Sequence, residues 1–160
     1  MKRVLIISYY WPPCGGAAVQ RWLKFTKYLG EFGWQPVVYT AENGEYPMHD
    51  ETLEKEVPKD VKVIRQPVWE PYSIYKKFTG RKSKETLKPE IVTETKKNSF
   101  AENLAIWVRG NFFIPDARKY WIKPSAQFLK EYLEQNPVDA IVSSIPPQTV
   151  HLIALELAKE

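Results

Sequence analysis

The fold of this chain is decided by residues 3–41, RVLIISYYWPPCGGAAVQRWLKFTKYLGEFGWQPVVYTA. The stretch begins with a continuous apolar run at residues 3–8, which is typical of a strand buried on both faces of a sheet. A glycine pair follows, then a helical pattern over residues 17–32 and a second strand pattern over residues 35–41. A strand, a helix and a second strand in this order predict a parallel pair joined by a right-handed crossover.

The predicted helix carries apolar side chains at spacings of three and four residues. We expect them to form one stripe that faces the sheet; they are Ala18, Trp22, Phe25, Leu29 and Phe32. Gly33 follows, at a position where the end of a helix favours glycine.

Further strands and helices are predicted downstream of this unit. Residues 60–67 favour a third strand near an edge, after a charged loop at residues 42–59. Pro124 suits the first turn of a helix that runs to about Gln135. Residues 138–144 predict a fourth strand, apolar on both faces. The inward positions of the two later helices are expected to be Ala126, Leu129 and Leu133, and then Val150, Ile153, Ala154 and Leu157.

These elements predict an α/β chain with a Rossmann-like, doubly wound and mostly parallel sheet of strand order 3-2-1-4, with helices on both faces. Ligands of such sheets bind beyond the carboxyl ends of the strands, where the strand order reverses. The loops at this point are PPCGGAA after the first strand and SSIPPQT after the fourth. Both precede a helix N-terminus, which favours phosphate. Gly15 and Gly16 would let a ligand approach the backbone closely.

Two observations qualify this interpretation. A glycine pair is often only a turn, with no role in ligand binding. The dinucleotide fingerprint G-x-G-x-x-G and the P-loop pattern are both absent from the sequence, which weighs against NAD binding and ATP hydrolysis.

The amino-acid composition places only weak limits on the partners and the cellular compartment of the protein. The formal net charge of +4 permits contact with phosphate or an anionic membrane without requiring either. The single cysteine, Cys14, excludes an internal disulfide and suits a reducing compartment such as the cytosol. Residues 2–8 do not continue into a signal-peptide cleavage site, and no apolar run reaches the length of about 18 residues needed to span a membrane.

Three segments carry a family resemblance: KRVLIISYYWPPCGGAAVQRWLKFTKYLGEFGWQPVVYTA, NFFIPDARKYWIKPS and VDAIVSSIPPQTVHLIALELAK. They resemble the N-terminal domain of bacterial family 4 glycosyltransferases, which have the two-domain GT-B fold. The resemblance implies a retaining transfer from a nucleotide-sugar donor, usually without a metal, to a glycan or lipid-linked acceptor in cell-envelope synthesis. Residues 1–160 would then be a truncated acceptor-side domain, with the donor domain absent and activity requiring the full-length protein.

The resemblance also implies roles for particular residues. Gly15 and Gly16 would contact the donor diphosphate, whereas catalytic residues are not assigned. Many family members carry a histidine after the fourth strand, where this chain has Ser143, Ser144 and Gln148. The candidates for the acceptor side are Gln20, Arg21, Arg118, Ser144 and Gln148.

Three other side chains have plainer interpretations. Asp116 is expected to cap a helix N-terminus. His151 is expected at the surface or in a cap. Cys14 is expected to be a small residue packed in a tight loop rather than a nucleophile.

A basic stretch at residues 76–97 precedes an aromatic, helix-like stretch at residues 99–113. Together they suggest peripheral contact with the anionic inner face of the cytoplasmic membrane; the alternative is a solvated loop followed by a core helix. Nucleic acid is not expected as a partner. Residues 138–144 would form an exposed sheet edge that favours self-association. The functional alternative to an enzyme is a non-catalytic Rossmann-like module that binds a phosphorylated ligand.

Overall fold

The computed structural model describes residues 1–69, 107, 110–111 and 113–159. Its strands and α-helices are, in chain order, β1 (Lys2–Ser8), α1 (Ala17–Leu29), β2 (Trp34–Ala41), β3 (Lys62–Gln66), α4 (Ile122–Gln135), β4 (Ala140–Ser144) and α5 (Thr149–Ala158). Three short 3-10 helices accompany them: η1 (Gly30–Phe32), η2 (Glu51–Glu56) and η3 (Lys119–Trp121).

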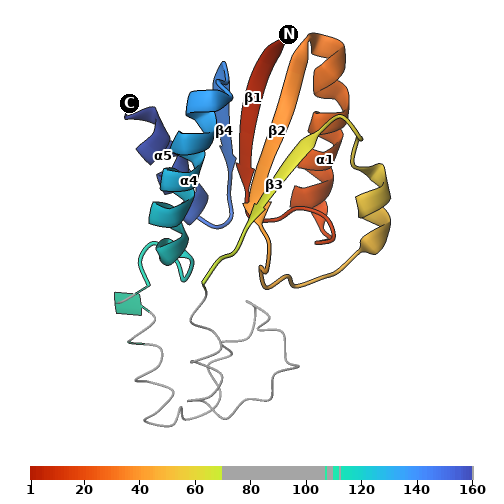
Figure 1. The fold of residues 1–160 in the computed structure, drawn as a ribbon. Helices are drawn as coiled ribbons and strands as arrows, with labels where there is room; N and C mark the ends of the chain where they lie inside the picture. Colours follow the sequence, from red (N-terminus) through yellow and green to blue (C-terminus); the bar gives the residue numbers. More distant parts are fainter. Residues whose placement is uncertain (70–106, 108–109, 112, 160) are drawn as a thin grey trace.

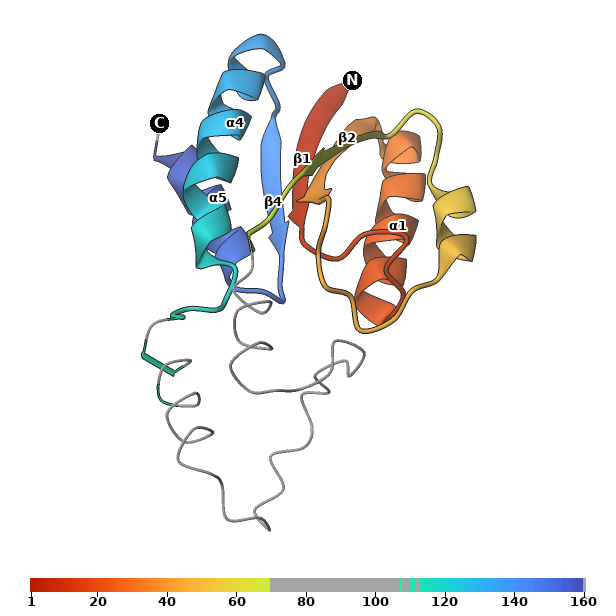
Figure 2. The same cartoon turned by 60° about the horizontal axis from the view of Figure 1, so that its bottom comes forward.

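The four strands form one parallel sheet in the order β3-β2-β1-β4, which confirms the predicted topology. Helix α1 covers one face of the sheet, and α4 and α5 cover the other (Figures 1 and 2). This is an α/β, Rossmann-like arrangement with helices on both faces. The chain order reverses between β1 and β4, where crevices form in open α/β sheets.

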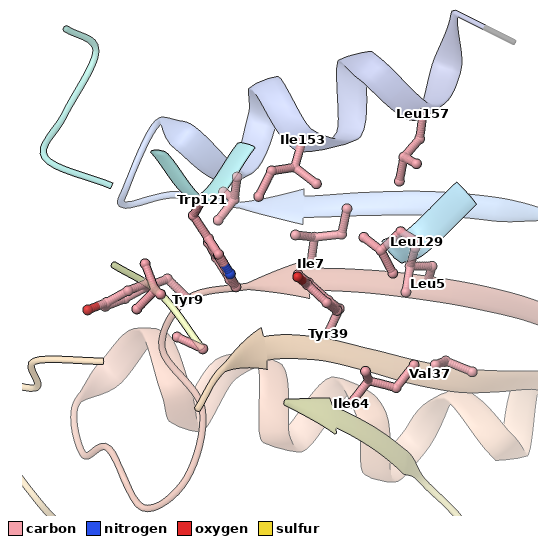
Figure 3. Packing of buried hydrophobic residues seen from close by; sticks show 13 residues of the cluster. Leu5, Ile7, Tyr9, Val37, Tyr39, Ile64, Trp121, Leu129, Ile153 and Leu157 are labelled. Atoms are coloured by element: carbon pink, nitrogen blue, oxygen red, sulfur yellow. The ribbon is translucent and has the colours of Figure 1, made fainter. Parts of the chain in front are cut away.

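Strand β1 is the centre of the core because its side chains alternate between two buried clusters. Leu5 and Ile7 pack toward α4 and α5, and Val4 and Ile6 pack toward α1. Figure 3 shows the first cluster, with Leu129 of α4 and the apolar side of α5 beside the strand. Burying each large aliphatic side chain contributes roughly 2 kcal/mol, so a strand buried on both faces, as its sequence predicts, anchors the whole domain.

The inward stripe predicted for α1 is only partly right, because Trp22 and Leu29 are half-buried and pack against the core cluster on this face. The helix buries Val19, Leu23 and Thr26, whereas the side chains of Phe25 and Phe32 are 51% and 77% exposed. The helix has two adjacent apolar rows, and spacing alone does not say which one faces the sheet. The row with smaller side chains lets the helix approach the strands more closely. The helix ends at Leu29, continues as η1, and stops at Gly33, whose left-handed φ of 78° confirms the expected glycine.

Other boundaries shift by a few residues. Strands β3 and β4 are shorter than predicted, and α4 begins at Ile122, two residues before the expected Pro124. The segment predicted as a loop at 42–59 contains η2, whose N-terminal Asp50 accepts a hydrogen bond from the amide of Thr52 (3.0 Å). The inward faces of the later helices are as expected, with Ala126, Leu129, Val150, Ile153 and Leu157 buried and Leu133 and Ala154 packed against the core.

Candidate functional site

The candidate site lies at the carboxyl ends of β1 and β4. Ser8 is paired in register with Ser144, so the loops that follow the two strands start side by side. The glycine loop leads from β1 into α1, and residues 145–148 lead from β4 into α5. The predicted pair of loops is therefore brought together at the point where the strand order reverses.

Gly16 stands at the N-terminus of α1 with φ 108° and ψ 164°, a conformation that is nearly restricted to glycine. A Cβ built at this residue would have no heavy atom within 4 Å. Among the described residues no side chain caps α1, and its first turn contains no acidic residue. The first amides of α1 therefore have no capping side chain and lie at the positive end of the helix dipole. This geometry is suited to an anion such as phosphate.

Gly15 has a different role from the predicted one. It is buried, and its amide donates a hydrogen bond to the carbonyl of Met48 (2.9 Å). A Cβ at this position would lie 3.1 Å from the Met48 side chain. The amide of Asp50 in turn donates to the carbonyl of Pro13 (2.7 Å). Gly15 thus allows two loops to pack, and its amide is already used, so the phosphate contact predicted for it has no support in this geometry.

Ser144 connects the two sides of the site. The indole N–H of Trp22 in α1 donates a hydrogen bond to the Ser144 hydroxyl at the end of β4. Ser144 is buried, so its role in the structure is to hold α1 against β4 rather than to meet an acceptor directly. Gln20 and Arg21 are exposed on α1, and the Arg21 guanidinium lies 6.0 Å from the centre of the Trp22 ring. Gln148 is exposed immediately before α5.

Asp116 acts as a clamp on the N-terminus of α5. Its carboxylate accepts hydrogen bonds from the amide and the hydroxyl of Thr149, both at 2.8 Å, and from the amide of Arg118 at 2.8 Å. Asp116 is expected from the sequence to cap the helix that follows it, but the N-cap residue of η3 is Arg118. The Asp116 carboxylate instead caps α5, which is distant in sequence. The Arg118 guanidinium lies 4.7 Å from the centre of the Tyr9 ring, directly after β1. The clamp therefore places the Arg118 segment beside the glycine loop and the β4 loop.

His151 makes a contact that the sequence did not predict. Its Nδ1 lies 2.5 Å from the hydroxyl oxygen of Ser143 at the end of β4. The imidazole is exposed, as expected, and its amide donates to the carbonyl of Gln148 (3.0 Å). A histidine in the first turn after a strand that ends in serine is the signal that could have suggested this pair.

An aromatic wall borders the glycine loop. Tyr9 accepts a hydrogen bond from the amide of Glu45 (2.9 Å) and packs edge-on against Tyr10 and Tyr46. A Cβ at Gly44 would lie 2.8 Å from the Tyr46 ring, so only glycine lets the chain pass here. Sequence analysis missed this wall because it treated residues 42–59 as a solvated loop.

Cys14 is 1% exposed, and burial raises the pKa of its thiol to about 11. The thiol is therefore protonated at neutral pH, in agreement with the packing role expected for it.

No cluster of three or more histidine, cysteine or acidic side chains suitable for a metal ion occurs in the described ranges. No helix in the described part of the chain has the length and apolar character required to cross a membrane. The basic stretch at 76–97 lies outside the described residues, as does most of 99–113.

Comparisons with models of protein families, with curated proteins and with solved structures give no match to this chain.

Proposed function

We propose that residues 1–160 are the acceptor-side part of a retaining glycosyltransferase that takes a sugar from a nucleotide-sugar donor and transfers it to a glycan or lipid-linked acceptor at the cytoplasmic side of the cell envelope. The observation that supports the proposal most directly is the backbone conformation of Gly16. This residue precedes the uncapped N-terminus of α1 at the strand-order reversal, in a conformation that other residues rarely adopt. The sequence resemblance supplies the sugar-transfer part of the proposal.

In this proposal the first amides of α1 hold the donor diphosphate, while a second domain outside these residues holds most of the nucleotide. Arg118, Arg21, Gln20 and Gln148 face the acceptor. The two arginines suit an acceptor that carries phosphate or carboxylate, because a guanidinium offers a planar set of donors. Ser144 orients α1 through Trp22. No cofactor other than the donor substrate is proposed.

The alternative is a non-catalytic module that binds a phosphorylated ligand at the same place. The open amides of α1 favour phosphate whether or not a sugar is transferred. The two functions differ only in whether a longer form of the protein has transferase activity.

Amide NMR tests the phosphate site. We expect inorganic pyrophosphate and nucleoside diphosphates to shift the amide resonances of Gly16, Ala17 and Ala18 in the labelled chain. Gly16→Ala should weaken this response strongly, because the substitution strains the backbone that aims the amides. Gly33→Ala is the matched control, since Gly33 also has a positive φ with open space around it but lies at the opposite end of α1. Equal effects of the two substitutions, or unshifted α1 amides, would contradict the proposed site.

A transfer assay then separates the enzyme from the module. In a full-length enzyme, Gly16→Ala should lower kcat/KM by about 100-fold, the usual scale for losing preorganised contacts to developing charge. Phosphate binding without any sugar transfer by the full-length protein would favour the binding module.

A further inference from the structure

An apolar groove lies between α1 and β4 on the face of the sheet opposite α4 and α5. Its α1 side is formed by Trp22, Phe25 and Leu29, the row that sequence analysis expected to face the core. Its β4 side is formed by Ala140 and Val142, and β1 forms the floor. The volume of the groove is about 280 Å³, and every residue that lines it is apolar. We refer to it as the α1–β4 groove.

The two ends of the α1–β4 groove carry positive charge. At the carboxyl end of the strands, the Arg21 guanidinium lies 6.0 Å from the centre of the Trp22 ring. At the amino end, Lys2 Nζ lies 5.6 Å from the centre of the Trp34 ring, which also lines the groove. Strand β1 runs between these ends, and seven residues of strand extend about 20 Å. Helix α1 itself contains no acidic residue that could neutralise Arg21.

The shape and charge of this groove indicate what kind of molecule can bind in it. Both faces of a parallel sheet are normally covered by helices, and here Ala140 and Val142 of β4 remain partly exposed beside α1. A second copy related by a two-fold axis would bring the same cationic rim against itself, which is unfavourable.

We propose that the α1–β4 groove docks an amphipathic helix of a partner polypeptide, with an apolar face and an acidic residue near each end. A helix rises 1.5 Å per residue, so about 13 residues cover the 20 Å between Lys2 and Arg21. Apolar residues spaced three and four apart on the docking helix contact Phe25 and Val142, which line the groove and remain accessible. Its two carboxylates pair with Arg21 and Lys2.

Two synthetic peptides of about 16 residues test this proposal. Both are helix-forming with the same leucine face; one has glutamate near each end and the other has lysine. Fluorescence anisotropy with the labelled peptides should show that the acidic peptide binds the 160-residue chain at least tenfold more tightly than the basic peptide. Phe25→Asp should abolish the binding of the acidic peptide, and because Phe25 is half exposed this substitution leaves the core intact.

Charge reversal tests the rim. Arg21→Glu should weaken binding of the acidic peptide by about fivefold or more, because the substitution changes a favourable exposed ion pair into a repulsive one. Lys27→Glu is the matched control, because five residues of helix place Lys27 on a different side of α1 from Trp22. The proposal is overturned if neither peptide binds, if both bind equally, or if Lys27→Glu has the same effect as Arg21→Glu. Self-association or vesicle binding that depends on Phe25 would also overturn it, since either would assign the groove to another occupant.

Discussion

At the scale of single residues, the glycine pair shows that neighbouring identical residues can serve unrelated purposes. Gly16 is needed for its backbone conformation, with φ 108°, and its surroundings are open. Gly15 is needed for space, because Met48 lies against it and uses its amide. An alanine at Gly16 therefore costs backbone strain, whereas an alanine at Gly15 pushes two loops apart.

Cys14 allows a direct test of how this loop is packed. Burial raises the pKa of its thiol from 9.0 to about 11, so the folded state retains the proton up to a higher pH than the unfolded chain does. At pH 8 the thiolate fraction of Cys14 should be about 100-fold lower than that of a free thiol, because each pKa unit is a factor of ten. Reaction with a disulfide reagent should be slow in buffer and fast in denaturant. Similar rates in the two conditions would mean that the loop is open.

At the scale of elements, α1 and α5 are both positioned by residues outside them. Trp22 of α1 is held by Ser144, and the N-terminus of α5 is held by Asp116. Neither helix has a side-chain cap at its own N-cap position. The carboxyl ends of the strands determine where the site lies, and these two contacts fix the N-terminal part of each helix relative to the site.

The Asp116 clamp should contribute measurably to stability. Asp116→Ala removes the acceptor of both Thr149 hydrogen bonds, so we expect the free energy of unfolding to fall by about 1–2 kcal/mol. Urea denaturation monitored by circular dichroism measures this change, and Asp60→Ala at an exposed residue serves as the control. The double variant with Thr149→Ala should be clearly less destabilised than the sum of the single variants. Additive effects would show that the two residues do not act together.

At the scale of the whole molecule, the two edges of the sheet differ in how they are protected. Strand β3 carries Lys62 and Arg65, the kind of charged residues that discourage pairing with another chain. Strand β4, AIVSS, carries no charge and pairs within the described residues only with β1. An uncharged strand with free backbone groups favours addition of a further strand.

We therefore predict that the 160-residue chain self-associates through β4. Sedimentation should show a concentration-dependent dimer, and Ile141→Lys should shift it toward the monomer. Phe25→Asp serves as the control, because it alters the α1–β4 groove without changing the edge. A monomer at all concentrations, or a dimer that Ile141→Lys leaves unchanged, would contradict association along this edge.

The sequence by itself determined the strand and helix order, the parallel topology and the end of the sheet where the candidate site lies. These follow from local periodicity, from the glycines at residues 16 and 33, and from the handedness of crossovers, none of which depends on distant contacts. The tertiary structure alone decided which row of α1 is buried, the use of the Gly15 amide by Met48, and the pairing of Asp116 with Thr149. Apart from the choice of row, these are hydrogen bonds whose partners are brought together by the packing of whole elements. The choice of row depends on how closely a helix can approach a sheet, which spacing along the chain does not encode.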